Sequence, residues 1–193
     1  MANIEHADEL TPCSKHDLLQ ALDVALFEHE LTDIKKEAVC LLAAQWALET
    51  GNGHSCHCWN LGNVKSSEGD GHDWCFFKCN ELLSQQVASR LTAADPEHVK
   101  VTSAPDANGC VWTWFYPPHP GCRFRAFDTL LDGAVDQVAV MAGRFKQAWP
   151  ALLSGDPVAF VHALKQQGYF TASETSYLRG VQALYTEMLK ECE

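Results

Sequence analysis

The segment that most constrains the fold of this chain is residues 34–50, IKKEAVCLLAAQWALET, an apolar run that meets a glycine at its end. In a helix, Leu42, Gln45 and Glu49 lie on one face, because they are spaced by three and four residues. Gly51 stands where many helices end in a left-handed residue. We therefore expect a helix that enters the core and carries a carboxylate in its last turn.

Glu49 has two reasons to hold a proton more tightly than an exposed glutamate. It projects from the apolar stripe beside Trp46, and partial burial disfavours the charged carboxylate. It also lies at the helix C-terminus, where the macrodipole is negative. A glutamate that stays protonated near neutral pH is suited to be the general acid of a glycosidase. From periodicity alone, a frayed helix end with a solvated carboxylate is the alternative.

The remaining pattern predicts a mostly helical α+β protein. Capping residues and apolar periodicity predict five helices. The first has Ser14 as its N-cap, the second begins after Thr32, and the third covers residues 133–149. The fourth runs from the N-cap Asp156 to about Gly168, and the fifth runs from a capping box of Thr171 and Glu174 to the C-terminus.

The β-structure is expected in the middle third of the chain. HVKVTS and VWTWFY are β-like runs separated by the turn sequence APDANG, which predicts a hairpin. The prolines of the following FYPPHPGCRFRAF exclude a helix there. We expect a single domain over residues 1–193, with a small β-lobe at roughly residues 96–127 between helical halves.

The charge of the chain bears on its partners. A formal net charge of −11 argues against nucleic acid or an anionic membrane surface and favours a basic protein partner. The first ten residues, MANIEHADEL, have no basic and apolar segments of a secretion signal, and no apolar run approaches the ~20 residues of a membrane span. We expect a chain made in the cytosol.

Several segments resemble the glucosaminidase family of peptidoglycan hydrolases. ALETGNG matches the A-L-E-T-G-x-G segment that carries the catalytic glutamate, and NLGNVK follows it as in the family, without the usual phenylalanine. CRFRAF is similar to the F-R-x-Y-x-S segment, with Phe127 in place of the tyrosine, and AFVHALKQQGYFTA is similar to the late helix and its G-Y turn. The resemblance covers about Ala38 to the end. It implies a lysozyme-like fold and Glu49 as the catalytic acid.

The resemblance also implies further site residues. Glu81 is similar to a glutamate of the family's β-lobe and is our candidate for the second catalytic group, although a 2-acetamido sugar can supply its own nucleophile. The acidic run at Glu68, Asp70 and Asp73 is expected to be a solvated loop. Asn60 is similar to the family's asparagine and is expected to orient the loop beside Glu49 and to contact substrate.

Aromatic residues supply the other candidates for substrate binding. Trp112, Trp114 and Tyr116 alternate along a predicted strand and would share one face. That face could stack on saccharides or be packed inside the β-lobe, and the sequence does not decide between the two. Tyr169, in the G-Y turn, could line a cleft or pack in the core.

The nine cysteines leave two possibilities open. Cys56, Cys58, Cys75 and Cys79 form C-H-C-x16-C-x3-C, a spacing that could bind zinc but is not the usual pair of C-x2-C knuckles. The alternative is disulfides within this long loop, with Cys110 to Cys122 closing the hairpin. We favour disulfides, because the substrate implied by the resemblance lies outside the cytosol.

The function expected is hydrolysis of β-1,4 bonds in peptidoglycan glycan strands, by an endo-β-N-acetylglucosaminidase or by a muramidase, without a cofactor. An acidic domain with neither wall-binding repeats nor a signal resembles effectors that type VI secretion systems inject into a rival's periplasm, which implies an immunity protein that blocks the cleft. A phage lysin is another possibility. A non-catalytic glycan- or protein-binding module and a zinc-stabilised interaction domain are the competing classes.

Overall fold

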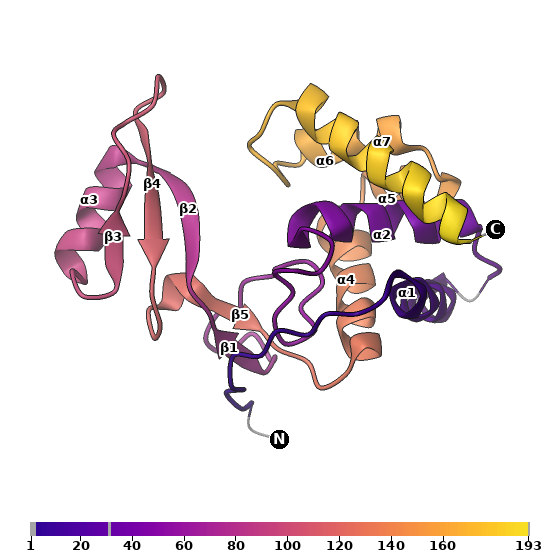
Figure 1. Cartoon of the computed structure of the whole chain (residues 1–193), viewed down its shortest axis with the longest axis horizontal. Coiled ribbons are helices and arrows are strands. Elements are labelled where there is room, and N and C mark those ends of the chain that lie inside the picture. Colours follow the sequence, from indigo (N-terminus) through magenta and orange to yellow (C-terminus); the bar gives the residue numbers. More distant parts are fainter. Residues whose placement is uncertain (1–2, 31, 193) are drawn as a thin grey trace. The chain divides into compact units, whose positions relative to one another are not determined.

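The computed structural model describes residues 3–30 and 32–192 (Figure 1). These residues form two compact parts. Residues 3–9 and 64–126 make up the strand unit, and residues 10–30, 32–63 and 127–192 make up the helical unit. Because each unit is described by itself, the single catalytic domain expected over residues 1–193 stays a prediction.

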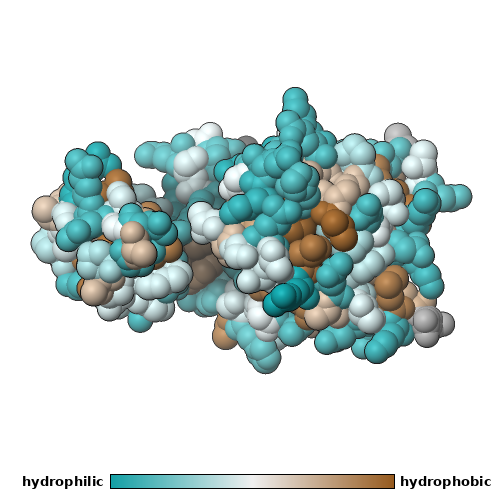
Figure 2. Space-filling view, turned by 90° about the horizontal axis from the view of Figure 1, so that it is seen from above, coloured by the Kyte–Doolittle hydropathy of each residue, from teal (hydrophilic) through white to brown (hydrophobic). Residues whose placement is uncertain are grey.

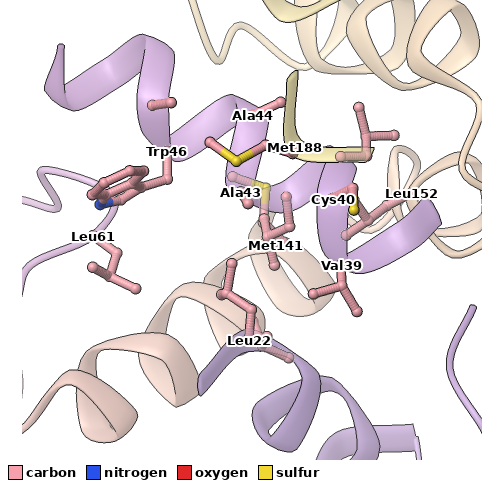
Figure 3. Close-up of a cluster of buried hydrophobic side chains, with 14 of the residues drawn as sticks. Leu22, Val39, Cys40, Ala43, Ala44, Trp46, Leu61, Met141, Leu152 and Met188 are labelled. Carbon is pink, nitrogen blue, oxygen red and sulfur yellow. The ribbon is translucent and has the colours of Figure 1, made fainter. Parts of the chain in front are cut away.

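The helical unit is built around one central helix. Its elements are α1 (Lys15–Glu30), α2 (Lys36–Thr50), α4 (Leu130–Arg144), α5 (Trp149–Ser154), α6 (Pro157–Gln166) and α7 (Glu174–Glu191). Helix α2 packs against α1, α5 and α7, and its residues from Ala38 to Ala47 are all buried. A helix that is apolar on every side belongs in the interior of a fold. Figure 3 shows its side chains Val39, Cys40 and Trp46 among those of α1, α4, α5 and α7.

Helix α2 ends as predicted but begins later. Gly51 adopts a left-handed conformation with φ 58° and donates its N–H to the carbonyl of Ala47, which confirms the predicted C-terminus. The helix begins at Lys36 rather than directly after Thr32. Lys35 is extended, and the segment before it instead places Ile34 against the core.

Two predicted N-caps are confirmed and one is wrong. The Ser14 hydroxyl accepts a hydrogen bond from the N–H of Asp17, and the Asp156 carboxylate accepts from Val158 and Ala159. Helix α7, however, is capped by Ser173, which accepts from the N–H of Ser176, and not by Thr171.

The helix expected over residues 133–149 is in fact two helices. Helix α4 ends at Arg144, and α5 begins at Trp149. Phe145, between them, leaves the helical conformation with φ −110° and ψ 39°, and its side chain is buried in the core. Burial of this ring therefore accompanies the break that the helical periodicity did not reveal.

The strand unit contains two antiparallel sheets. Strands β1 (Trp74–Phe76) and β5 (Arg123–Arg125) pair in one of them, and β2 (Cys79–Ser84), β4 (Cys110–Phe115) and β3 (Val99–Val101) pair in that order in the other. The predicted hairpin of residues 98–116 is confirmed as β3 and β4. Strands β1 and β2 were not predicted, because β1 has only three residues and β2, CNELLS, contains none of the β-branched or aromatic residues that favour strands.

Two short helices of the strand unit were also missed. Helix α3 (Gln85–Ala94) begins at the N-cap Ser84 and packs against β2, β3 and β4. A 3-10 helix, Pro120–Cys122, lies in the proline-rich segment that was expected to hold no helix. Its proline is in the first turn, where the missing N–H costs no intrahelical hydrogen bond.

The surface is largely hydrophilic. Hydrophilic side chains cover most of the face seen in Figure 2, with small apolar patches between them. Among the helices of the described residues, none combines the length and the apolar character that crossing a membrane requires.

Candidate active site

Glu49 lies in the last turn of α2, where Thr50 and Gly51 end the helix, and its side chain is partly buried. The hydroxyl of Tyr177 donates a hydrogen bond of 2.7 Å to Oε1 of Glu49. The two residues are 128 positions apart in the sequence and are brought together by the packing of α7 on α2. One oxygen of the carboxyl group is thus held by the protein.

Burial raises the pKa of Glu49 above its usual value of 4.5, and the hydrogen bond from Tyr177 acts in the opposite direction without cancelling the effect. The raised pKa agrees with the sequence prediction. A carboxyl group in this state can donate a proton to a leaving oxygen at a pH where an exposed glutamate is fully ionised.

Tyr177 is itself fixed by an aromatic neighbour. The ring of Phe170 stacks on it, with 3.8 Å between centroids and 2° between the ring planes. Burial, together with the nearby Glu49 carboxylate, raises the pKa of Tyr177, so its hydroxyl remains a donor. Tyr177 was missed in the sequence, although it lies on one face of α7 with the buried Val181 and Met188, a spacing that predicts a core-facing position.

Tyr169 belongs to a polar network around Gln45, which lies one helical turn before Glu49 on α2. Its hydroxyl accepts a hydrogen bond from the side-chain amide of Gln45, and the oxygen of Gln45 accepts one of 2.8 Å from Gln137. The ring of Phe145 meets Tyr169 edge-on. Tyr169 was predicted to contact substrate or to pack in the core, and the structure places its hydroxyl in this network. Its role in substrate binding stays a prediction.

The loop after α2 contributes backbone support to Glu49. The side chain of Asn63 donates a hydrogen bond of 3.3 Å to the carbonyl oxygen of Glu49. Asn60, the predicted site residue, is only 1% exposed, and its carbonyl accepts from the N–H of Asn63. Cys58 and Trp59 have φ values of 48° and 54°, which are uncommon for residues with a side chain. Contact between Asn60 and a substrate stays a prediction.

Glu81 lies in the strand unit, on β2, and its side chain is 46% exposed. It forms an ion pair of 3.2 Å with Lys65, whose ammonium group also lies 3.2 Å from the sulfur of Cys79 and donates to the carbonyl of Gly121. Its part as a second catalytic group stays a prediction, because Glu49 belongs to the other unit.

The acidic loop of residues 68–73 is more ordered than the sequence suggested. The carboxylate of Asp70 accepts hydrogen bonds from the N–H groups of Ser67 and His72, and that of Asp73 accepts from Ile4. The hydrogen bond from Ile4 lowers the pKa of Asp73, despite some opposing effect of burial. Two of the three acidic side chains are therefore used to hold the loop and the N-terminal segment together.

The alternation predicted for the aromatic strand is present in the three-stranded sheet. Val111, Thr113 and Phe115 are buried on the face that α3 covers. Trp112, which is 46% exposed, lies on the other face opposite Leu82. This second face, which we call the open sheet face, consists of Asn80, Leu82, Lys100, Trp112 and Trp114.

A lysine side chain already lies over two of the three aromatic rings that were predicted to stack on saccharides. The ammonium group of Lys78 lies 4.2 Å from the ring centroid of Trp114 and 4.9 Å from that of Tyr116. Trp112 is the ring of the three with the most exposed surface. Saccharide stacking on this face stays a prediction.

The structure does not contain the cysteine pairs that were expected. All nine cysteines are free. Cys110 lies opposite Ser84 at one end of β4, whereas Cys122 lies beside Phe77 and Cys79 near the other end, next to Phe115. A strand of this length spans about 17 Å, so a disulfide between Cys110 and Cys122 is ruled out by the register.

The proposed zinc ligands are likewise not gathered into a site. Cys56 and Cys58 belong to the helical unit, and Cys75 and Cys79 belong to the strand unit. Across residues 3–30 and 32–192, no group of three or more His, Cys, Asp or Glu side chains is placed to hold a metal ion.

Two solved structures share this fold over most of the chain. The glycoside hydrolase domain of FlgJ from Salmonella typhimurium is 17% identical, with a TM-score of 0.51, and the alignment covers 92% of this chain and 99% of that one. A peptidoglycan hydrolase mutant from Sphingomonas sp. A1 is 19% identical, with a TM-score of 0.51 and 92% of both chains covered. No protein-family model and no curated protein matches the sequence.

These similarities define the class of fold. The chain has the mostly helical α+β, lysozyme-like fold that the sequence resemblance implied, and that expectation is confirmed. At identities this low the likeness concerns the fold, and the chemistry has to be argued from the residues.

Proposed function

We propose that the chain is a glycoside hydrolase that cleaves β-1,4 bonds in the glycan strands of peptidoglycan, with Glu49 as the general acid. The observation that carries the proposal is the partly buried carboxyl group of Glu49, with its raised pKa and one oxygen held by Tyr177. The two similar structures, a glycoside hydrolase domain and a peptidoglycan hydrolase mutant, support the proposed reaction and substrate.

Within this reaction, Glu49 donates its proton to the oxygen of the leaving sugar as the glycosidic bond breaks. The positive charge that develops on the other sugar needs a second group. Glu81 is our candidate, and the 2-acetamido group of the substrate is the alternative. The proposed substrate-binding residues are Asn60, Trp112, Trp114, Tyr116 and Tyr169.

Digestion of purified peptidoglycan tests the proposal. The wild type should release soluble muropeptides, and Glu49→Gln should lower the rate by at least about a hundredfold, since general acid catalysis contributes this much. Glu37→Gln, in the first turn of the same helix, is the matched control and should stay active. If Glu49→Gln is folded and as active as the wild type, Glu49 is not the acid.

The bond that is cut is the next question. We infer an endo-β-N-acetylglucosaminidase, by the sequence resemblance, and a muramidase is the alternative. Reduction of the products with borohydride, followed by mass spectrometry, distinguishes the two. N-acetylglucosaminitol at the reduced ends supports the first, and N-acetylmuramitol supports the second. If both the wild type and the variant are inert but bind glycan, the fold serves as a binding module.

We also propose that the protein is a bacteriolytic effector, exported by a dedicated secretion system such as type VI to act in the periplasm of target cells. The acidic charge of −11 favours a basic partner, which fits an immunity protein that blocks the cleft. Expression in a test bacterium with and without a periplasmic signal peptide examines the idea. Lysis should require the signal, and equal toxicity from the cytosol would contradict the proposal.

A further inference from the structure

Two cysteines from distant parts of the chain meet in the helical unit. The sulfur atoms of Cys40 and Cys192 are 3.0 Å apart, although 152 positions separate them in the sequence. Cys40 is fully buried within α2, where Figure 3 shows it near Val39, Leu152 and Met188. Cys192 is the residue at the C-terminal cap of α7 and is partly exposed. A disulfide has a sulfur–sulfur distance of about 2.05 Å, so the two sulfurs need to approach by only about 1 Å.

The two helices that carry these cysteines are also the helices of the candidate active site. Helix α2 carries Cys40 near its beginning and Glu49 in its last turn, and α7 carries Tyr177 near its beginning and Cys192 at its end. The two helices therefore run in opposite directions, with the thiol pair at one end of their contact and the Glu49–Tyr177 hydrogen bond at the other. A covalent link between the cysteines would hold α7 on α2.

We propose that Cys40 and Cys192 form a disulfide when the folded protein enters an oxidising compartment, and that this bond fastens the end of α7 to α2. The inference concerns a modification of the chain and does not depend on the proposed activity. It also differs from the pairings expected from the sequence, which included neither of these residues.

The oxidant is a small disulfide such as oxidised glutathione. The thiolate of Cys192 attacks one of its sulfurs, which forms a mixed disulfide and releases one molecule of reduced thiol. Cys40 then loses its proton and attacks the sulfur of Cys192, which releases the second reduced thiol. Two protein thiols are oxidised by two electrons and one small disulfide is reduced, so the exchange is balanced.

The order of these steps follows from the solvent access of Cys192 and the low reactivity of the buried Cys40 thiol. A pocket of about 390 Å³ between α1, the beginning of α2 and the end of α7 is lined by Cys192, Lys36 and Val39, among others. Cys192 is therefore reachable from solvent, whereas Cys40 is enclosed. Burial, assisted by the contact with Cys192, raises the pKa of the Cys40 thiol to about 12. Cys192 is accordingly the group that reacts first, and closure by Cys40 is the slower step.

The experiment is oxidation of the folded, reduced protein with oxidised glutathione, followed by a count of free thiols after denaturation. The count should fall from nine to seven. Because trypsin leaves Cys40, Cys56 and Cys58 on one peptide, chymotrypsin is added to cut after Trp46 before mass spectrometry. The cross-linked product should then join the peptide of Cys40 to that of Cys192.

Thermal unfolding gives a second readout. The oxidised protein should melt about 10 °C higher than the reduced protein, because the link closes a long loop of the unfolded chain, and dithiothreitol should reverse the shift. Cys192→Ser should remove both the shift and the cross-linked peptide. Cys40→Ala provides a second test that places no hydroxyl in the core. Cys110→Ser, on a strand of the other unit, is the matched control. This variant should keep both the shift in melting temperature and the cross-linked peptide.

The proposal is overturned if the folded protein retains all its thiols, if Cys192 carries only a stable glutathione adduct, or if the cross-link joins other cysteines. Loss of peptidoglycan hydrolysis in every form of the protein would contradict the proposed function but leave this inference standing. The experiments therefore distinguish a failure of the disulfide proposal from a failure of the proposed function.

Discussion

At the scale of single residues, the hydrogen bond between Tyr177 and Glu49 holds one oxygen of the candidate acid in place and also affects its proton affinity. It fixes Oε1, which leaves the other carboxyl oxygen available to a ligand. It also lowers the pKa of Glu49, in opposition to the larger effect of burial. Tyr177 is therefore a positioning residue, whose removal should change two observables at once.

We predict that Tyr177→Phe slows peptidoglycan hydrolysis by about tenfold, the order expected when a hydrogen bond to a charged group is lost. Without the hydroxyl, the pKa of Glu49 should rise further, so the alkaline limb of the pH–rate profile should move to higher pH. Tyr185→Phe is the matched control on the same helix, since its hydroxyl donates to the carbonyl of Gly155. A slower enzyme with an unmoved alkaline limb would mean that Tyr177 acts only through packing.

The raised pKa of Glu49 also predicts how stability depends on pH. Because the folded-state pKa lies above 4.5, the folded protein keeps a proton that the unfolded chain has lost. This contribution to stability is fully present below pH 4.5 and is lost as the pH rises through the folded-state pKa. Glu49→Gln carries no such group. Its unfolding free energy relative to the wild type should therefore increase with pH above 4.5 and then level off.

Urea unfolding of both proteins from about pH 4 to pH 8 checks this prediction. A difference in unfolding free energy that is flat across the range would show that Glu49 has an ordinary pKa in the folded state, and one that decreases with pH would show a lowered pKa; either result contradicts the prediction.

The sequence predicts Glu49 as the candidate acid because its helical face, its helix terminus and its motif all agree. Tyr177 and Asn63 were not identified, since each acts through a single contact with a residue far away in the chain. Gln45 was placed on the right face, but its partners, Gln137 and Tyr169, depend on how α4 and the turn before α7 pack. Contacts of this kind have no local pattern.

At the scale of elements, the contact between α4 and the loop after α2 depends on a glycine. A Cβ atom at Gly133 would lie 2.0 Å from the carbonyl oxygen of Trp59, a distance that backbone atoms cannot accept. Gly143, near the end of the same helix, has nothing within 4 Å of the same position. Substitution of Gly133 tests close packing together with helix propensity, whereas substitution of Gly143 tests helix propensity alone.

We predict that Gly133→Ala lowers the free energy of unfolding by about 3 kcal/mol, through overpacking against the loop. Gly143→Ala should raise it by about 0.5 kcal/mol, because alanine favours the helix. Chemical denaturation of the two variants measures both values. Equal effects of the two substitutions would contradict the close approach of the loop to α4.

The N-cap of α7 gives a second prediction at this scale. Ser173→Ala should destabilise the protein by about 1 kcal/mol, since it removes the acceptor for the N–H of Ser176. Thr171→Ala, at the position that the sequence favoured, should change the stability by less than about 0.5 kcal/mol. Thermal unfolding of both variants compares them, and the reverse order would restore the capping box that the sequence predicted.

Helix ends were predictable where one polar residue precedes an apolar run, as at Ser14 and Asp156. At the start of α7, Thr171 and Ser173 both have suitable side chains, and only the path of the chain after Gly168 decides between them. Helix α3 was missed because it buries a single residue, Ala88, and presents its apolar side to a sheet that had not itself been fully predicted.

At the scale of the whole molecule, the core of the helical unit is made entirely by its own residues, from Leu18 on α1 to Met188 on α7. The larger part of the strand unit, residues 64–126, is inserted into the chain between Asn63 and Phe127, and its smaller part is residues 3–9. The N–H of Phe127 donates to the carbonyl of Cys58, so the return of the chain is anchored within the helical unit. A helical unit with these properties should fold alone.

We predict that a variant with residues 64–126 replaced by a flexible linker of about ten Gly and Ser residues keeps a cooperative thermal transition. The expected circular dichroism is that of a helical protein, because the buried core is retained. The full chain serves as the control. A broad, non-cooperative transition would show that the helical unit depends on the strand unit for its stability.

The overall class of fold was predictable, since the helical and β-like segments occur in the right order along the chain. The extent of the strand unit was not. Residues 74–84 pair with β4 and β5, which follow them by some 30 to 50 positions, and short strands of this kind are defined by their partners rather than by their own composition. The predicted disulfide between Cys110 and Cys122 was wrong for the same reason. The register of the sheet, which the sequence did not reveal, places these two cysteines near opposite ends of β4.

The burial of α2 on all sides has a consequence for motion. Its central amide groups, from Ala38 to Ala47, have no route to solvent short of disassembly of the helical core. They should be among the last in the protein to exchange hydrogen for deuterium, at the rate of global opening. Because Glu49 follows this segment in the last turn of the same helix, the candidate proton donor is attached to the part of the helical unit that we expect to open last.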